Sequence, residues 1–199
     1  MSEQIQKVFS ESQAILLSLA SDSVRVGMIE QIARKIVESF RRGNKLLLMG
    51  NGGSAADAQH IAAEFVGRFK LERHALPAIA LTTNSSILTA LSNDYSFEEL
   101  FARQVKALAI QGDVLLGIST SGNSRNVLTA FQIAREMGAF TIGLTGEPGG
   151  QMDAYADWVI KVPSDNTARI QEALLVVEHL ICEIVEQEIA CSNAIGGGR

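Results

Sequence analysis

Five short apolar runs constrain the fold of this chain more than any other feature. Short, mostly apolar runs of this kind are typical of strands that are buried on both faces of a parallel sheet. The stretches between the runs carry apolar residues at helical spacing. The runs occupy residues 45–50, 78–81, 114–119, 141–145 and 158–162. This alternation predicts an α/β fold, a three-layer sandwich in which about five parallel strands are flanked by helices.

The same periodicity divides the chain into three parts. Residues 1–42 are predicted to form two helices, with Gly43 placed to end the second. Residues 43–192 are predicted to form one α/β domain, and the glycine-rich residues 193–199 a flexible tail. Within the domain, helical patterns lie near residues 54–70, 85–92, 97–109, 123–137 and 167–190.

Composition narrows the classes of partner. The chain has 199 residues, of which 47% are hydrophobic and 20% charged, and a net charge of -5 with no long basic run. Nucleic acid is therefore not an expected partner. No apolar run approaches the roughly 18 residues needed to span a bilayer, and the N-terminus lacks a secretory pattern, so we expect a cytoplasmic protein with no membrane partner. Cys182 and Cys191 match no zinc or redox spacing.

Two of the predicted helices each carry a pair of metal-competent residues on one face. His60 and Glu64 are four residues apart, and Gln171 and His179 are eight apart. Residues at these spacings lie within about 40° of the same helical stripe. Imidazole, carboxylate and amide oxygen together suit a divalent cation of the zinc type. Taken alone, each pair is more often a surface contact or a core histidine.

A serine-rich loop follows the third apolar run, at residues 119–124 (STSGNS). Its hydroxyls, with the free N–H groups of the helix that it enters, are the donors that a phosphate needs. The lysine of a nucleoside triphosphate loop is missing, and no GxGxxG follows the first run. A sugar phosphate therefore fits better than a nucleotide, although serine and asparagine could simply cap the helix. A metal beside such a loop suggests an enzyme that acts on a phosphorylated metabolite.

Two longer motifs resemble a known family. Residues 50–60 (GNGGSAADAQH) and 117–124 (GISTSGNS) are similar to sugar isomerase (SIS) domains, which have a flavodoxin-like, nucleotide-binding type of fold. With residues 93–95 (NDY) and 169–172 (RIQE), the resemblance narrows to the phosphoheptose isomerases. It extends from the N-terminal helices to about residue 190.

The resemblance implies a reaction and a set of site residues. The reaction is conversion of sedoheptulose 7-phosphate to D-glycero-D-manno-heptose 7-phosphate, the first step toward ADP- or GDP-heptose for lipopolysaccharide core or surface glycans. The resemblance also implies a homotetramer assembled through the N-terminal and C-terminal helices. One Zn²⁺ per subunit, or another divalent metal, would be bound by His60, Glu64, Gln171 and His179. The sugar phosphate would be bound by Asn51, Gly52, Gly53, Glu64, Asn93, Asp94, Ser119, Thr120, Ser121, Ser124 and Gln171.

An aldose–ketose isomerase must move a proton between adjacent carbons and stabilise the enediolate formed on the way. Glu64 is the better candidate for the base, and His179 could shuttle the proton between the oxygens or act at the neighbouring carbon. A residue that holds a metal firmly is a poorer base. The sequence therefore leaves open whether these two catalytic candidates are metal ligands, acid–base groups, or each in turn.

Two other functions are compatible with the same motifs. One is a non-catalytic SIS-domain regulator that binds a phosphosugar or the replication initiator DnaA, as a paralogue lacking the full catalytic set does. The other is an isomerase for a different sugar phosphate. The presence of Glu64 and His179 favours an enzyme over a regulator.

Overall fold

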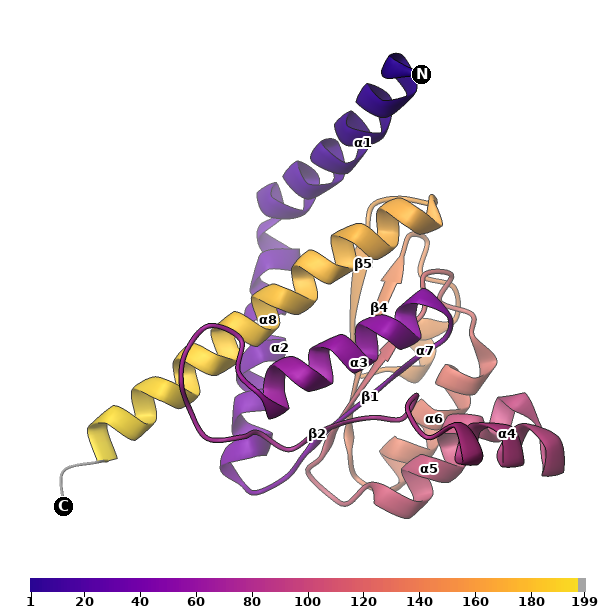
Figure 1. Cartoon of the computed structure of the whole chain (residues 1–199), viewed down its shortest axis with the longest axis vertical. Coiled ribbons are helices and arrows are strands. Elements are labelled where there is room, and N and C mark those ends of the chain that lie inside the picture. Colours follow the sequence, from indigo (N-terminus) through magenta and orange to yellow (C-terminus); the bar gives the residue numbers. More distant parts are fainter. Residues whose placement is uncertain (197–199) are drawn as a thin grey trace.

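The computed structural model describes the backbone of residues 1–196 and the side chains of residues 1–191. Five parallel strands form one sheet in the order β2-β1-β3-β4-β5 (Figure 1). This confirms the predicted α/β fold with a five-stranded parallel sheet. The strands are β1 (Leu46–Gly50), β2 (Ala78–Ala80), β3 (Val114–Ile118), β4 (Phe140–Gly146) and β5 (Trp158–Val162).

Helices cover both faces of the sheet and complete the three layers. One layer contains α2 (Ser23–Arg41), α3 (Gly53–Val66) and α8 (Thr167–Gly196). The other contains α4 (Ser85–Asp94), the 3-10 turn η1 (Phe97–Glu99), α5 (Leu100–Leu108), α6 (Arg125–Glu136) and the short α7 (Met152–Tyr155).

Strand β1 illustrates why its residues are apolar without alternation. Leu46 and Leu48 pack in the core beneath α2, α3 and α8, whereas Leu47 and Met49 pack in the core beneath α5 and α6. Successive side chains of a strand point to opposite faces, so both sets must be apolar when helices cover both faces. The two cores account for the continuous apolar runs in the sequence.

Helix α1 (Ser2–Ser21) departs from this compact arrangement. It extends beyond the sheet and ends in the free N-terminus (Figure 1), and Leu19 is its one buried residue. Asp22 separates α1 from α2, because its carboxylate accepts hydrogen bonds from the backbone N–H groups of Val24 and Arg25 at 3.0 and 3.1 Å. An aspartate in this position caps the second helix and marks its start.

The element boundaries differ from the prediction at several points. The helix predicted near residues 97–109 is a 3-10 turn followed by α5, and α7 was not predicted. Helix α8 continues to Gly196, so residues 193–196 of the expected tail are helical, and residues 197–199 lie outside the described residues. Within the described part of the chain, no helix is both long and apolar enough to cross a bilayer.

Asp113 joins the starts of β1 and β3. Its buried carboxylate accepts hydrogen bonds from Asn44 Nδ2, from the Lys45 backbone N–H and ammonium group, and from the Ile110 backbone N–H, at 2.6 to 3.2 Å. Burial alone would raise the pKa of Asp113, but these hydrogen bonds outweigh it and hold the pKa below 3.8. The ionised carboxylate therefore stabilises the fold.

We expect Asp113→Asn to lower the free energy of unfolding at pH 7 by about 3 kcal/mol, because it leaves Lys45 without its buried partner. A group with a lowered folded-state pKa contributes stability above its unfolded-state pKa and loses it as the pH falls through the folded value. The difference between wild type and variant should therefore shrink when urea unfolding is repeated in acid. Equal stability of the two proteins at pH 7 would contradict this account.

Candidate active site

The site is built at the carboxyl ends of β1 and β3. Gly50 at the end of β1 is in register with Ile118 at the end of β3, so the two following loops start side by side. One loop, residues 51–53, leads into α3, and the other, residues 119–124, leads into α6. In open parallel sheets, ligands bind just beyond the carboxyl ends of the strands. The two loops with the predicted binding residues thus lie together.

The serine-rich loop is held by its own hydrogen bonds. Ser119 Oγ donates to Ser124 Oγ at 2.9 Å, and the Gly122 N–H donates to the Ser119 carbonyl oxygen at 2.9 Å. Gly122 has φ +66°, and a Cβ atom there would lie 1.9 Å from the carbonyl oxygen of Gly149. Only glycine therefore fits at this turn. The Thr120 carbonyl oxygen accepts the Gly146 N–H at 3.1 Å, which ties the loop to β4.

The loop does more than cap its helix. Ser124 is the residue before α6, yet its side chain makes no capping hydrogen bond to that helix. Ser121 is exposed at the tip of the loop. Hydroxyls that are not used for capping, together with the N-terminus of a helix, are available to a phosphate group. The Ser124 hydroxyl is therefore not explained by capping of α6.

Helices α3 and α8 lie side by side (Figure 1) and bring the two predicted pairs together. His60 Nε2 of α3 lies 2.9 Å from His179 Nε2 of α8. Glu64 Oε1 lies 3.6 Å from His60 Nε2. Phe69, in the loop after α3, stacks on the His179 ring with 5.4 Å between ring centroids. Residues separated by more than a hundred positions in the sequence thus meet at one point.

Gln171 lies against the start of α3. Its Nε2 atom donates a hydrogen bond to Asp57 Oδ2 at 2.8 Å. A carboxylate oxygen is an acceptor, so this bond turns the amide oxygen of Gln171 away from Asp57 and leaves it free for a ligand. Burial raises the pKa of Asp57, while the Gln171 hydrogen bond and the charge of His60 oppose that rise. Asp57 thus bonds to Gln171 and also lies near His60.

A buried ion pair holds the two helices in this arrangement. Arg73 donates to the carbonyl oxygens of Glu64 and Phe65 at 2.8 Å each, at the end of α3. Glu186 of α8 lies 3.3 Å from Arg73 Nε and also accepts three backbone N–H groups of residues 69–71 at 2.7 to 2.8 Å. Burial raises the pKa of Glu186, but these donors outweigh it and keep the pKa low.

Glu178 is a second carboxyl group on the buried side of α8. It is 1% exposed, and neither of its oxygens has a hydrogen-bond partner among the described residues. Burial and the neighbouring charge of Asp57 raise the pKa of Glu178 to about 9. The group is therefore neutral at pH 7, which removes the cost of a buried unpaired charge.

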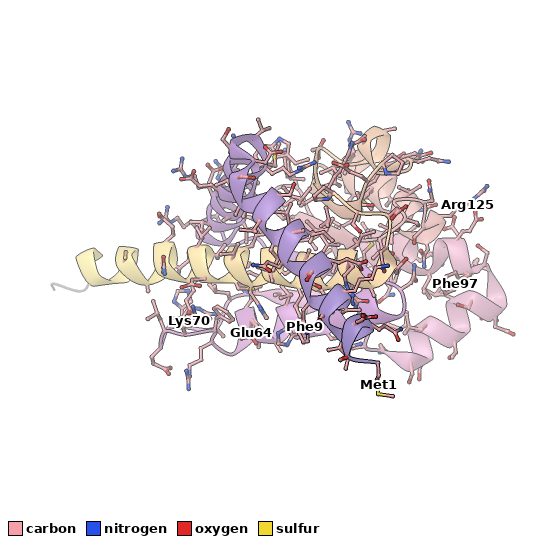
Figure 2. All side chains as sticks on the ribbon, turned by 90° about the horizontal axis from the view of Figure 1, so that it is seen from above. Met1, Phe9, Glu64, Lys70, Phe97 and Arg125 are labelled. Carbon is pink, nitrogen blue, oxygen red and sulfur yellow. The ribbon has the colours of Figure 1, made fainter. Side chains whose placement is uncertain are left out.

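Asn93 and Asp94 are the predicted site residues that the structure places elsewhere. They are exposed at the end of α4, where Asn93 Nδ2 donates to Asp94 Oδ1 at 2.8 Å. Phe97, which follows this helix, lies toward one end of the molecule and well apart from Glu64 (Figure 2). A cavity of about 350 Å³ reaches from Asn51 and Gly52 to Ser92 of α4. Asn93 and Asp94 follow Ser92 in the chain but do not line this cavity.

Several residues around the site could not be found from sequence reasoning. Phe69 and Arg73 orient the predicted residues without belonging to any recognised motif, and Asp57 lies within the 50–60 motif but was assigned no role. One signal was available in α8, where Glu178 and Glu186 occupy a stripe that is otherwise apolar. Charged residues at core positions are usually paired or neutral.

Comparison with known proteins decides the family. The SIS domain family matches residues 9–146. Phosphoheptose isomerase of Roseiflexus is 61% identical over 162 residues, covering 81% of this chain and 82% of the relative. Phosphoheptose isomerase of Aneurinibacillus thermoaerophilus is 49% identical over 189 residues, covering 95% and 96%. The chain belongs to the phosphoheptose isomerase family of SIS-domain proteins.

Solved structures of the family have the same fold. Phosphoheptose isomerase GmhA of Neisseria gonorrhoeae matches with a TM-score of 0.86 and 41% identity, over 94% of this chain and 98% of that one. A phosphoheptose isomerase of Francisella tularensis matches with a TM-score of 0.89 and 38% identity, over 93% and 97%. The predicted resemblance to phosphoheptose isomerases is therefore confirmed, and so is the SIS fold.

Gly53 offers a test of the site geometry in this phosphoheptose isomerase family member. A Cβ atom at Gly53 would lie 2.4 Å from Gln171 Nε2 and 2.5 Å from its Oε1. We expect Gly53→Ala to displace the Gln171 amide from Asp57 and to lower kcat/KM about 100-fold. Thermal unfolding should change little, because the clash involves the far end of a flexible side chain.

Gly27→Ala is the matched control, since a Cβ atom there meets nothing within 4 Å and alanine favours a helix. It should leave kcat/KM unchanged. Activity of Gly53→Ala equal to that of the control would show that the position of Gln171 does not matter for turnover.

Proposed function

We propose that this protein converts sedoheptulose 7-phosphate to D-glycero-D-manno-heptose 7-phosphate. The observation that carries the proposal is the meeting of His60 and Glu64 with His179 in a chain of the phosphoheptose isomerase family that also has a serine-rich loop suited to phosphate. The product would serve as a precursor of ADP- or GDP-heptose. A cytoplasmic location agrees with a phosphorylated substrate and is part of the same proposal.

We assign separate roles to the loops that follow β1 and β3 and to the residues of α3 and α8. Residues 119–124 bind the phosphate group, with Asn51, Gly52 and Gly53 beside them. Holding the far end of the sugar makes proton transfer at the other end effectively unimolecular. Asn93 and Asp94, which follow the cavity-lining residue Ser92 of α4, are proposed to contact the substrate as well.

Glu64 is proposed as the base that takes the carbon-bound proton. Its side chain is 20% exposed, so a substrate can reach it. His179 is held by Phe69 and by its contact with His60, which supports a role in moving a proton between the two substrate oxygens. General acid–base groups of this kind contribute about 10² to 10⁴ in rate.

We also propose that His60, Glu64, Gln171 and His179 hold a divalent metal, with Zn²⁺ the first choice. Among the described residues, no three histidine, cysteine, aspartate or glutamate side chains are arranged as a finished metal site. The donors nevertheless fit, because the two imidazole nitrogens face each other and the Gln171 oxygen is unused. When bound, the metal would polarise the substrate carbonyl as a Lewis acid.

A regulator that binds a phosphosugar or DnaA without turnover is the second candidate. It has less support, because the chain retains both the carboxylate of Glu64 and the imidazole of His179, and its relatives are named as isomerases. A different sugar phosphate as substrate also has less support for the same reason.

The direct test is incubation with sedoheptulose 7-phosphate, with and without a chelator and then with added Zn²⁺. Product that disappears with chelator and returns with Zn²⁺ would support both the reaction and the metal. Turnover that resists the chelator would keep the isomerase and reject the metal. Absence of product together with a higher melting temperature in the presence of the sugar phosphate would favour the regulator.

Glu64→Gln should lower kcat by at least about 10² while the protein remains folded, because an amide cannot accept the carbon-bound proton. Glu72→Gln is a suitable control, since the Glu72 side chain is 90% exposed in the loop after α3. Wild-type turnover by Glu64→Gln would reject Glu64 as the base.

A homotetramer is proposed for the assembly. Helix α1 exposes Ile5, Phe9 and Leu16 along one stripe, and Phe9 is 72% exposed near the free end of the helix (Figure 2). A groove of about 330 Å³ lined mainly by apolar side chains of α2 and α8, among them Val26 and Leu180, lies on the body of the molecule. Exposed apolar side chains on α1 and an apolar groove on α2 and α8 support association between copies of the chain.

Phe9→Asp should shift the protein from tetramer to smaller species in size-exclusion chromatography with light scattering, because a charge replaces an apolar contact at the interface. Lys7→Asp places the same charge on the opposite side of α1 and should leave the assembly unchanged. An unchanged tetramer in Phe9→Asp would exclude the α1 stripe as the interface.

A further inference from the structure

Two asparagines join the loops at the carboxyl ends of β1 and β3. Asn51 Nδ2 donates to Asn126 Oδ1 at 2.9 Å, and Asn126 Nδ2 donates to Asn51 Oδ1 at 2.9 Å. Asn126 is in the first turn of α6, immediately beyond the serine-rich loop, and is 2% exposed. The same Asn126 oxygen also accepts the Val127 backbone N–H at 3.0 Å. One buried side chain thus connects Asn51 with the start of α6.

We propose that Asn126 is a positioning residue, which fixes Asn51 against the phosphate-binding loop so that the two loops bind the sugar phosphate as one unit. The inference rests on the proposed substrate-binding role of Asn51 and of residues 119–124. Asn126 itself is too deeply buried to touch the substrate. Its effect on the reaction is therefore exerted through Asn51.

The chemistry of the pair explains why an amide is needed at both positions. Each side chain supplies one donor and one acceptor, and a second amide matches both at once. A carboxylate could accept but not donate, and a hydroxyl is too short to reach with two atoms. In a buried setting, a fully matched pair rigidifies its surroundings, whereas loss of one partner leaves a polar group unsatisfied.

The pairing also leaves Asn51 ready for a ligand. Its amide oxygen and one amide N–H are used by Asn126, so the second N–H of the amide is not consumed by the pair. The side chain cannot rotate without breaking two hydrogen bonds. The direction of the remaining donor is therefore set before the substrate binds, which lowers the entropic cost of binding.

Unlike most buried polar pairs, the Asn51–Asn126 pair links two segments that the sheet does not hold together. The loops that it joins are neighbours because β1 and β3 are adjacent in the sheet, but register alone sets only the strand ends, Gly50 and Ile118. Beyond those residues the chain enters two separate helices, α3 and α6. The Asn51–Asn126 pair is a side-chain link across that divergence.

The test is a double-mutant cycle with Asn51→Ala, Asn126→Ala and the double variant. KM and kcat are measured with sedoheptulose 7-phosphate, and affinity for the same sugar phosphate is measured by calorimetry. We expect each single variant to raise KM and the dissociation constant about tenfold, with a smaller change in kcat. The double variant should be no worse than Asn51→Ala, because Asn126 has nothing left to position.

Asn44→Ala is the matched control. Asn44 is also a buried asparagine, with its amide bonded to Gln111 and Asp113, but it lies at the amino ends of the strands, on the side of the sheet away from the site. It should lower the melting temperature and leave KM unchanged. Asn126→Ser, which keeps a small polar residue in the first turn of α6, replaces Asn126→Ala if that variant does not fold.

Two results would overturn the inference. One is an Asn126 variant whose KM and dissociation constant equal those of wild type. The other is an Asn126 substitution that weakens binding by the same factor in the Asn51→Ala background as in wild type, since that shows independent action. Failure of the proposed function is a separate outcome, visible as absence of turnover in wild type, and the calorimetric cycle still decides the role of Asn126.

Discussion

Helices α3 and α8 pack side by side over one face of the sheet, and the candidate site exists only because of that contact. Each helix contributes residues on one stripe, and neither stripe has a complete set of donors. Arg73 and Glu186 secure the contact, since Arg73 binds the last turn of α3 and Glu186 belongs to α8. Breaking a buried pair of this kind costs about 3 to 5 kcal/mol. Loss of this pair would therefore both destabilise the packing of α3 against α8 and move the site residues apart.

Buried carboxyl groups in this protein are handled in two different ways. Asp113 and Glu186 keep their charge, because several hydrogen-bond donors surround each of them and hold the pKa low. Glu178 has no such donors and is neutral, with a pKa of about 9. Burial favours the neutral form in every case, and the number of donors decides whether that preference wins.

The position of the two loops that follow β1 and β3 depends on the parallel register of these strands. Register brings the ends of the two strands together, and the chain then separates into α3 and α6. The hydroxyl pair of Ser119 and Ser124 and the amide pair of Asn51 and Asn126 act beyond that point. Backbone pairing thus sets the location of the two loops that we propose to bind phosphate, and side-chain pairing links them beyond the strand ends.

The sequence by itself determined the fold class and singled out candidate site residues within single helices and loops. Short apolar runs identified the five strands because both faces of each strand are covered. Helical spacing identified the pairs His60 with Glu64 and Gln171 with His179, because each pair lies within a single element.

Tertiary structure alone decided how those pairs meet and what supports them. The contacts of Asp57 with Gln171 and of Asn51 with Asn126 join residues from different elements. The spacing of residues within one helix or strand therefore cannot predict them. Tertiary structure also decided which neighbours surround a buried carboxyl group, and therefore which of Glu178 and Glu186 keeps its charge. Periodicity reports the face on which a side chain lies, whereas partners across a core are set by how whole helices and strands pack.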